Sequence, residues 1–167
     1  MFLMALDFAG QAVEVLSQPM RLTFWNRSGA REHTPDFLAI TRSGIWLIDV
    51  RPTDRIKDED RESFAAAAAV AEYCGWRFGL VGGWLEHVPT TLDWFSSQRR
   101  PLVDQLVVQP GLLAGARERA TFGQLAQASA YPPVARAHLL HLLWHRRIGL
   151  DLRRPLGDQS IIVAAEE

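Results

Sequence analysis

The segment from His33 to Pro52 constrains the fold of this chain more than any other. Residues 37–40 and 45–50 are apolar runs rich in β-branched and aromatic side chains, and a Ser-Gly pair between them supplies a chain reversal. The pattern predicts two antiparallel strands joined by a tight turn. Such a hairpin brings Asp36, at the start of the first strand, and Asp49, near the end of the second, to the same end.

Arg51 adds a cation to this acid pair. It lies two positions after Asp49, so the alternation of a strand points both side chains to one face. Adjacent carboxylates repel when both are ionised, and a hard divalent cation removes that repulsion while leaving positions for water and phosphate. The residue types therefore predict metal-dependent phosphodiester hydrolysis, with Arg51 offsetting charge in the transition state. Arginine stays protonated, so Arg51 cannot be the general base that a lysine provides.

The spacing of these residues resembles a nuclease signature. Pro35-Asp36, followed thirteen positions later by Asp49-Val50-Arg51, is similar to the PD-(D/E)-x-K core, with Arg in the usual place of Lys. The segments His-Thr-Pro-Asp-Phe-Leu, Leu-Ile-Asp-Val-Arg-Pro and Cys-Gly-Trp-Arg extend the match. With them, most of the chain resembles the endonuclease subunit of two-protein transposases, the TnsA-like family.

The resemblance implies a fold, a cofactor and partners. The fold is α/β, a restriction-endonuclease-like mixed sheet with flanking helices over residues 1–90, followed by a small C-terminal module. Asp36 and Asp49 would bind Mg²⁺ or Mn²⁺, and Arg51 would complete the catalytic set. The chain would nick DNA at transposon ends beside a separate DDE-type transposase and an ATPase regulator.

Several alternatives stay open at this point. The family also implies a third acid, a glutamate on an N-terminal helix, which residues 1–8 do not supply. Three explanations are open: the domain is truncated, the acid is missing, or another acid replaces it. Glu14 is the better candidate for a replacement and Asp7 the weaker one. The missing glutamate and Arg51 both favour a catalytically degenerate DNA-binding or scaffold subunit. A stand-alone transcription regulator is a third hypothesis, and a short Pro-Asp…Asp-x-Arg match also arises from a turn and a surface ion pair.

The remainder of the first domain is expected to continue the sheet. Residues 21–25 predict a strand beside the central hairpin, and residues 76–81 predict another. Between them, residues 64–73 predict an alanine-rich helix that acidic residues precede, where the helix dipole favours negative charge. Cys74 follows that helix and is expected to be a small buried residue.

Residues 91–167 predict a helical linker and a winged-helix-like module. A helical stretch over residues 102–114 precedes Thr121, which with Gln three positions later has the spacing of a capping box. That box opens a short helix, and a Pro-Pro pair opens a second that extends to Arg147. Two strands, residues 148–152 and 160–163, are expected to follow and to enclose an arginine-bearing tip.

Basic side chains of both regions are candidates for DNA contact, although arginines that only solubilise a packing module would give the same pattern. The candidates are Arg55, Lys57, Arg136, Arg146, Arg147, Arg153 and Arg154.

Histidine and cysteine give weaker signals. His138, His141 and His145 share a helix face, but without a nearby acid or cysteine, packing is favoured over zinc binding. His33 is expected to be a structural partner more than a phosphate ligand. The single cysteine and the lack of a long apolar run predict a cytoplasmic protein without a membrane segment.

Overall fold

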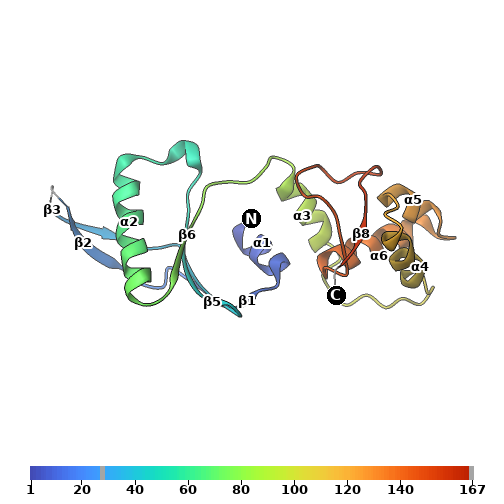
Figure 1. The fold of residues 1–167 in the computed structure, drawn as a ribbon, viewed down its shortest axis with the longest axis horizontal. Helices are drawn as coiled ribbons and strands as arrows, with labels where there is room; N and C mark the ends of the chain where they lie inside the picture. Colours follow the sequence, from blue (N-terminus) through green and yellow to red (C-terminus); the bar gives the residue numbers. More distant parts are fainter. Residues whose placement is uncertain (27–28, 166–167) are drawn as a thin grey trace. The chain divides into compact units, whose positions relative to one another are not determined.

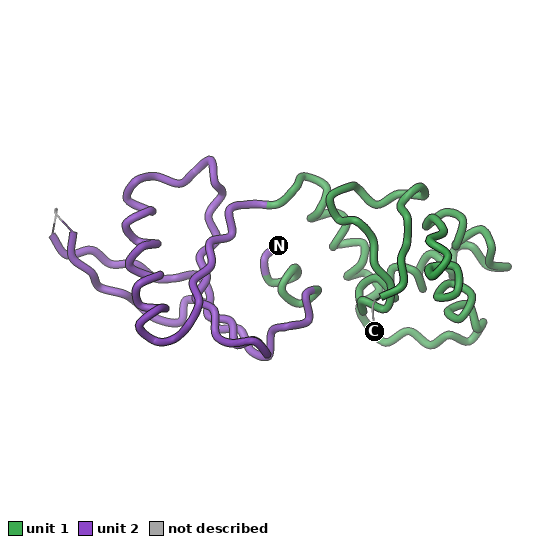
Figure 2. Tube along the Cα trace, viewed as in Figure 1, with its two compact units in different colours: residues 1, 3–8, 84–167 green, residues 2, 9–83 purple. Residues whose placement is uncertain are grey.

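A computed structural model of the chain describes residues 1–26 and 29–165. The chain divides into two compact units (Figure 2). Residues 9–83, with Phe2, form what we call the sheet unit, and residues 1, 3–8 and 84–167 form the helical unit. The N-terminal helix α1 (Phe2–Ala9) thus has most of its residues in the same unit as the C-terminal half of the chain.

The sheet unit is built on a four-stranded mixed sheet. Its order is β1 (Ala12–Ser17), β4 (Phe37–Thr41), β5 (Gly44–Val50) and β6 (Arg77–Val81). The first three strands are antiparallel, and β6 runs parallel to β5 after the crossover helix α2 (Asp58–Tyr73) (Figure 1). This confirms the expected α/β class with a mixed sheet and helices.

The predicted central hairpin is present as β4 and β5. Their register runs from Phe37 opposite Ile48 to Thr41 opposite Gly44. The Thr41 hydroxyl donates to the Gly44 carbonyl at 2.7 Å, and Gly44 has φ +132°, a conformation that favours glycine. Continuing the register by one residue sets Asp36 opposite Asp49.

Helix α2 packs on the sheet through its smallest residues. Ala67 and Ala71 are fully buried and form one core cluster with Leu47 and Leu38. Because these alanines lack bulk, the helix approaches the strands closely. The face of β5 that carries Leu47 is therefore the face beneath α2.

Cys74 is exposed, which corrects the expectation that it is buried. The reason lies in how the helix ends: Gly75 has φ +70°, and the Trp76 amide donates to the Ala71 carbonyl at 2.7 Å. This turn brings Trp76 back against the core cluster in place of Cys74.

The strand expected beside the central hairpin is placed differently. β2 (Leu22–Asn26) pairs only with β3 (Gly29–His33), and the two form a separate antiparallel sheet. The prediction was wrong because β1 already occupies the edge of β4. The sequence Asn-Arg-Ser-Gly predicts a turn over residues 26–29, and two of these, residues 27 and 28, lie outside the described residues.

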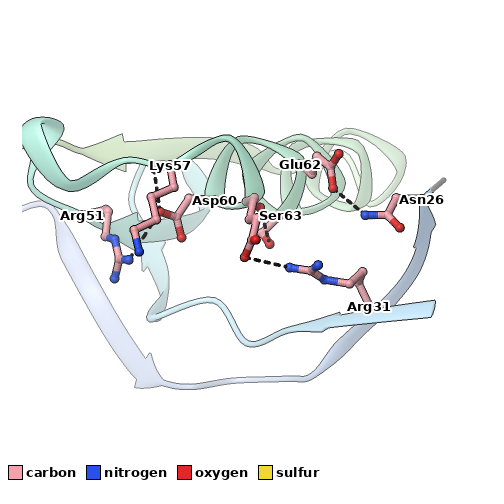
Figure 3. Close-up of polar contacts among 8 residues, drawn as sticks. Asn26, Arg31, Arg51, Lys57, Asp60, Glu62 and Ser63 are labelled. Atoms are coloured by element: carbon pink, nitrogen blue, oxygen red, sulfur yellow. Dashed lines mark hydrogen bonds and ion pairs between the residues drawn. The ribbon is translucent and has the colours of Figure 1, made fainter. Parts of the chain in front are cut away.

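The hairpin β2–β3 is joined to α2 by polar contacts (Figure 3). Asn26 Nδ2 donates to Glu62 Oε2 at 2.6 Å, and the Arg31 guanidinium lies 3.4 Å from Glu59 Oε2. These contacts attach both strands of the hairpin to α2, including β3, whose last residue is His33.

The helical unit has its own core. Helices α3 (Val88–Ser96), α4 (Gln109–Arg117), α5 (Phe122–Gln127) and α6 (Pro132–Trp144) enclose the larger of the two clusters of buried apolar residues. Phe8 of α1 contributes aromatic contacts to this unit, since its ring centroid is 5.7 Å from those of two buried aromatic residues, Phe95 and Trp144. No helix in the described part of the chain is both long and apolar enough to cross a bilayer.

Helix α4 begins later than the helix predicted over residues 102–114. The Asp104 carboxylate accepts hydrogen bonds from the amides of Val108 and Gln109, each at 2.9 Å, and so caps a helix that starts at Gln109. Val107, just before it, has φ +52°. Residues 102–108 are consequently not helical, and the prediction was wrong for that part.

The predicted capping box at Thr121 is confirmed. The Gln124 amide donates to Thr121 Oγ1 at 3.2 Å, and the Thr121 amide donates to Gln124 Oε1 at 2.9 Å. The strands that follow α6, β7 (Ile148–Gly149) and β8 (Val163–Ala164), pair antiparallel but are shorter than predicted.

Loss of this cap gives the first testable prediction. We expect Thr121→Ala to lower the free energy of unfolding by about 1 kcal/mol, because the Gln124 amide loses its acceptor. Urea unfolding followed by the loss of helix signal measures it. Thr121→Ser keeps the hydroxyl and should cost much less; equal losses for the two variants would contradict the capping role.

Candidate functional site

Two backbone hydrogen bonds hold Asp36 and Asp49 together. The Asp36 amide donates to Asp49 Oδ1 at 3.3 Å, and the Val50 amide donates to Asp36 Oδ2 at 2.8 Å. Asp49 is only 2% exposed, whereas Asp36, the residue before β4, is half-buried. The structure thus brings together the two acids that the sequence predicted at one end of the hairpin.

His33 is a third member of this cluster. Its Nε2 lies 3.0 Å from Asp49 Oδ2, and the edge of its ring packs against Phe64 of α2, with 6.3 Å between ring centroids. The sequence analysis expected a structural role for His33 but did not predict which residue it contacts. The only sequence signal is its position three residues before Asp36, because the contact depends on how the β2–β3 hairpin lies along α2.

Burial dominates the electrostatics of Asp49. Removal from water raises its pKa above the usual 3.8, although the hydrogen bond and charge of His33 oppose the shift. The fold therefore favours the protonated form. The stability that follows from this is fully present below pH 3.8 and is lost as the pH rises through the pKa of the folded protein.

This sign predicts how Asp49→Asn behaves without divalent metal. Asparagine does not ionise, so we expect the variant's free energy of unfolding to increase relative to the wild type as the pH rises from about 3 to about 7. Urea unfolding of both proteins in chelator, at matched pH values, measures the difference. A difference that is constant with pH would contradict an energetic cost of the buried carboxylate.

Arg51 directly follows β5 and is engaged with α2. Its guanidinium is 3.4 Å from Asp60 Oδ2, and the side chain is exposed (Figure 3). The Lys57 amide donates to the same carboxylate at 2.9 Å. These contacts lower the pKa of Asp60, the Lys57 amide most and Arg51 in addition. The ion pair directs Arg51 toward the beginning of α2.

The other basic candidates of the sheet unit lie on the connection from β5 to α2. Arg55 belongs to a short 3₁₀ turn (Thr53–Arg55), and Lys57 precedes the first residue of α2. Both side chains are exposed. Together with Arg51 they make this connection basic.

Glu14, one of the two candidates for a third acid, does not join the pair in the described sheet unit. Glu14 is exposed and pairs with Ile40, four residues along β4 from Asp36, a separation of roughly 13 Å in a strand. Asp7 is exposed and belongs to the helical unit. Among residues 1–26 and 29–165, no group of three or more His, Cys, Asp or Glu side chains is placed to hold a metal ion.

The donor set nevertheless suits a hard cation. Mg²⁺ is commonly held by one or two carboxylates, with waters and substrate phosphate as its other ligands. Each carboxylate oxygen of Asp36 and Asp49 has more than one lone pair, so a hydrogen bond from a backbone amide does not prevent ligation. A bound cation would also offset the cost of the buried Asp49 charge.

In the helical unit, three of the arginine candidates are engaged within the protein. Arg136 pairs with Asp158 at 2.8 Å and lies over the Phe122 ring, and Arg153 pairs with Asp151 at 2.9 Å. The Arg146 guanidinium donates to a backbone carbonyl of α1. Arg147 and Arg154 are exposed.

The three histidines attach α6 and its C-cap residue, His145, to α4 and to the segment that follows α3. His138 Nδ1 lies 3.0 Å from Nε2 of Gln109, the first residue of α4. His141 Nδ1 lies 2.8 Å from the Gln98 carbonyl, and His145 Nε2 lies 3.2 Å from the carbonyl of the next residue, Arg99. These contacts support the interpretation that the histidines pack against their surroundings.

Comparison with known proteins does not name a family. No family model matches the chain, and no curated protein is similar to it.

Proposed function

We propose that the chain is a TnsA-like endonuclease subunit that hydrolyses phosphodiester bonds at transposon DNA ends with Mg²⁺ or Mn²⁺. The observation that most supports it is the acid pair at the end of a hairpin, in which the buried Asp49 carboxylate accepts the Asp36 amide and the Asp36 carboxylate accepts the Val50 amide. The mixed sheet beneath α2 agrees with a restriction-endonuclease-like fold. The working partners would be a DDE-type transposase and an ATPase regulator, in the cytoplasm.

The chain's own residues divide the work. Asp36 and Asp49 would hold the cation, which when bound supplies Lewis-acid activation of water and of the scissile phosphate. Arg51 would place a permanent positive charge beside the phosphate, and its ion pair with Asp60 ties its side chain to the beginning of α2. Arg51 does not take up the proton of the attacking water, because a guanidinium stays charged.

The helical unit would bind DNA as a winged-helix-like module. Its order supports this: α4 is followed by Thr121, which bridges to Ile161, then by α5, α6 and the pair β7–β8. The long connection between β7 and β8 carries Arg153 and Arg154 and would be the wing.

A second candidate is a degenerate subunit that binds DNA or partners without cleaving. The position of His33 favours it, because Nε2 already contacts the Oδ2 oxygen of Asp49. The pairing of Arg51 with Asp60 and the absence of a third acid beside the pair in the described residues point the same way.

Metal titration by calorimetry separates the two. For an active subunit we expect Mg²⁺ or Mn²⁺ to bind the full chain, and Asp36→Asn to weaken binding at least about tenfold while still accepting the Val50 amide. Asp54→Asn, an exposed acid of the same connection, is the matched control and should bind like the wild type. Equal affinity of the wild type and Asp36→Asn would support the degenerate subunit.

A further inference from the structure

A pocket of about 650 Å³ in the helical unit is lined mainly by the connection between β7 and β8. Its volume is in the range of small-molecule sites. Arg119, just after α4, forms part of the lining, and the long connection with Val163 of β8 forms the rest. The lining combines two arginines and two acids with apolar residues that include Leu150, Pro155 and Ile161.

The acids of the pocket are already neutralised. The Asp151 carboxylate accepts hydrogen bonds from Nε and Nη2 of Arg153, at 2.9 and 3.2 Å. The Asp158 carboxylate pairs with Arg136 at 2.8 Å. Neither Arg153 nor Arg136 lines the pocket. The pKa of Asp151 is lowered chiefly by Arg153, with the nearby charge of Arg154 adding to the effect.

The arginines that line the pocket, in contrast, have no such partner. Within residues 1–26 and 29–165, the guanidinium groups of Arg119 and Arg154 donate no hydrogen bond and form no ion pair. Counting the two neutralised acids with their arginines, the site keeps two positive charges. Arg119 lies just after the end of α4 and has φ +59°. Its amide donates to the Ala116 carbonyl, and this hydrogen bond fixes the backbone from which the side chain extends.

We propose that this pocket binds a nucleotide unit, with its phosphate on Arg119 and Arg154 and its sugar and base against the apolar residues. Arginine is suited to phosphate because its planar donors match two oxygens at once. The apolar part of the lining, which includes half-exposed Ile161, suits the ring of a base. That the bound nucleotide unit belongs to a DNA strand rests on the proposed function. The phosphate site formed by Arg119 and Arg154 does not.

The test is nuclear magnetic resonance of the full chain with three probes: a short single-stranded oligothymidylate, thymidine monophosphate and inorganic phosphate. We expect the oligonucleotide to shift the Arg119 and Arg154 Nε signals and the Ile161 methyl signals. A monophosphate that shifts them equally well would identify a free nucleotide as the source of the phosphate. Inorganic phosphate should bind at least about tenfold more weakly than the monophosphate, since it lacks the apolar part.

Variants make the result specific to the pocket. Arg119→Gln and Arg154→Gln should each weaken binding about tenfold and make its salt dependence shallower by about 0.7 per lost contact. Arg117→Gln, an exposed arginine of α4 outside the lining, is the control and should bind like the wild type. Both substituted side chains are exposed, so the variants are expected to keep the fold, which their spectra report.

Two outcomes would overturn the proposal. One is that no probe shifts the pocket signals. The other is that Arg117→Gln weakens binding as much as Arg119→Gln, which would mean diffuse attraction to a basic surface. Because these signals belong to the helical unit and require no cleavage, their failure is distinguishable from the failure of Asp36 and Asp49 to bind metal.

Discussion

Asp49→Asn is expected to reduce metal-dependent DNA nicking by about 10²–10³-fold, the usual effect of removing one group that stabilises transition-state charge. The substitution keeps one contact of this side chain and alters the other, since an amide nitrogen replaces the Oδ2 atom that contacts His33. The amide oxygen of asparagine can still accept the Asp36 backbone amide, so the hairpin end keeps its hydrogen bond. What is lost is the negative charge that would hold the cation.

Nicking of supercoiled plasmid DNA, with Mg²⁺ and with Mn²⁺, measures this effect. Asp54→Asn removes an exposed acid from the same connection and should nick at the wild-type rate. An Asp49→Asn protein that nicks as fast as the wild type would remove the acid pair from the mechanism. A wild-type chain that does not nick with either metal would instead support the degenerate subunit.

Leu47→Ala is expected to lower the free energy of unfolding of the sheet unit by about 2–5 kcal/mol. Leu47 is fully buried between β5 and α2, where it packs against Ala67 and Ala71. Alanines cannot extend to fill the space that it leaves, so a cavity remains. The loss also reaches the site, because Leu47 precedes Asp49 by two residues on the same face.

Urea unfolding, with hydrogen exchange of the β5 and β6 amides to identify the unit, measures this loss. Val13→Ala, at a 70% exposed position of β1, is the control and should change stability by about 0.5 kcal/mol or less. A loss below about 1 kcal/mol for Leu47→Ala would contradict the packing of α2 on this face.

The sequence predicted the parts of the fold that depend on local pattern. The hairpin of β4 and β5 follows from two apolar runs with a reversal between them, and the cap of α5 follows from the spacing of Thr121 and Gln124. Proximity of Asp36 and Asp49 is a consequence of the hairpin register alone. That is why the acid pair could be predicted without knowledge of the tertiary structure.

The parts that were missed depend on contacts between distant segments. The placement of β2 depends on β1 having taken the edge of β4, and nothing local to β2 records that. The contact of His33 with Asp49 requires the β2–β3 hairpin to lie along α2. Likewise, the ion pair of Arg136 with Asp158 joins α6 to the connection between β7 and β8, and no local pattern in the sequence predicts it.

Paramagnetic broadening by Mn²⁺ tests the account most directly, because it locates the cation without requiring partners or cleavage. With substoichiometric Mn²⁺, the amide signals of Asp36 and Val50 should broaden first in the wild type and stay sharp in Asp49→Asn. Broadening that begins at the acids of Asp58–Asp60, or that is unchanged in Asp49→Asn, would show that the hairpin acids do not bind the metal.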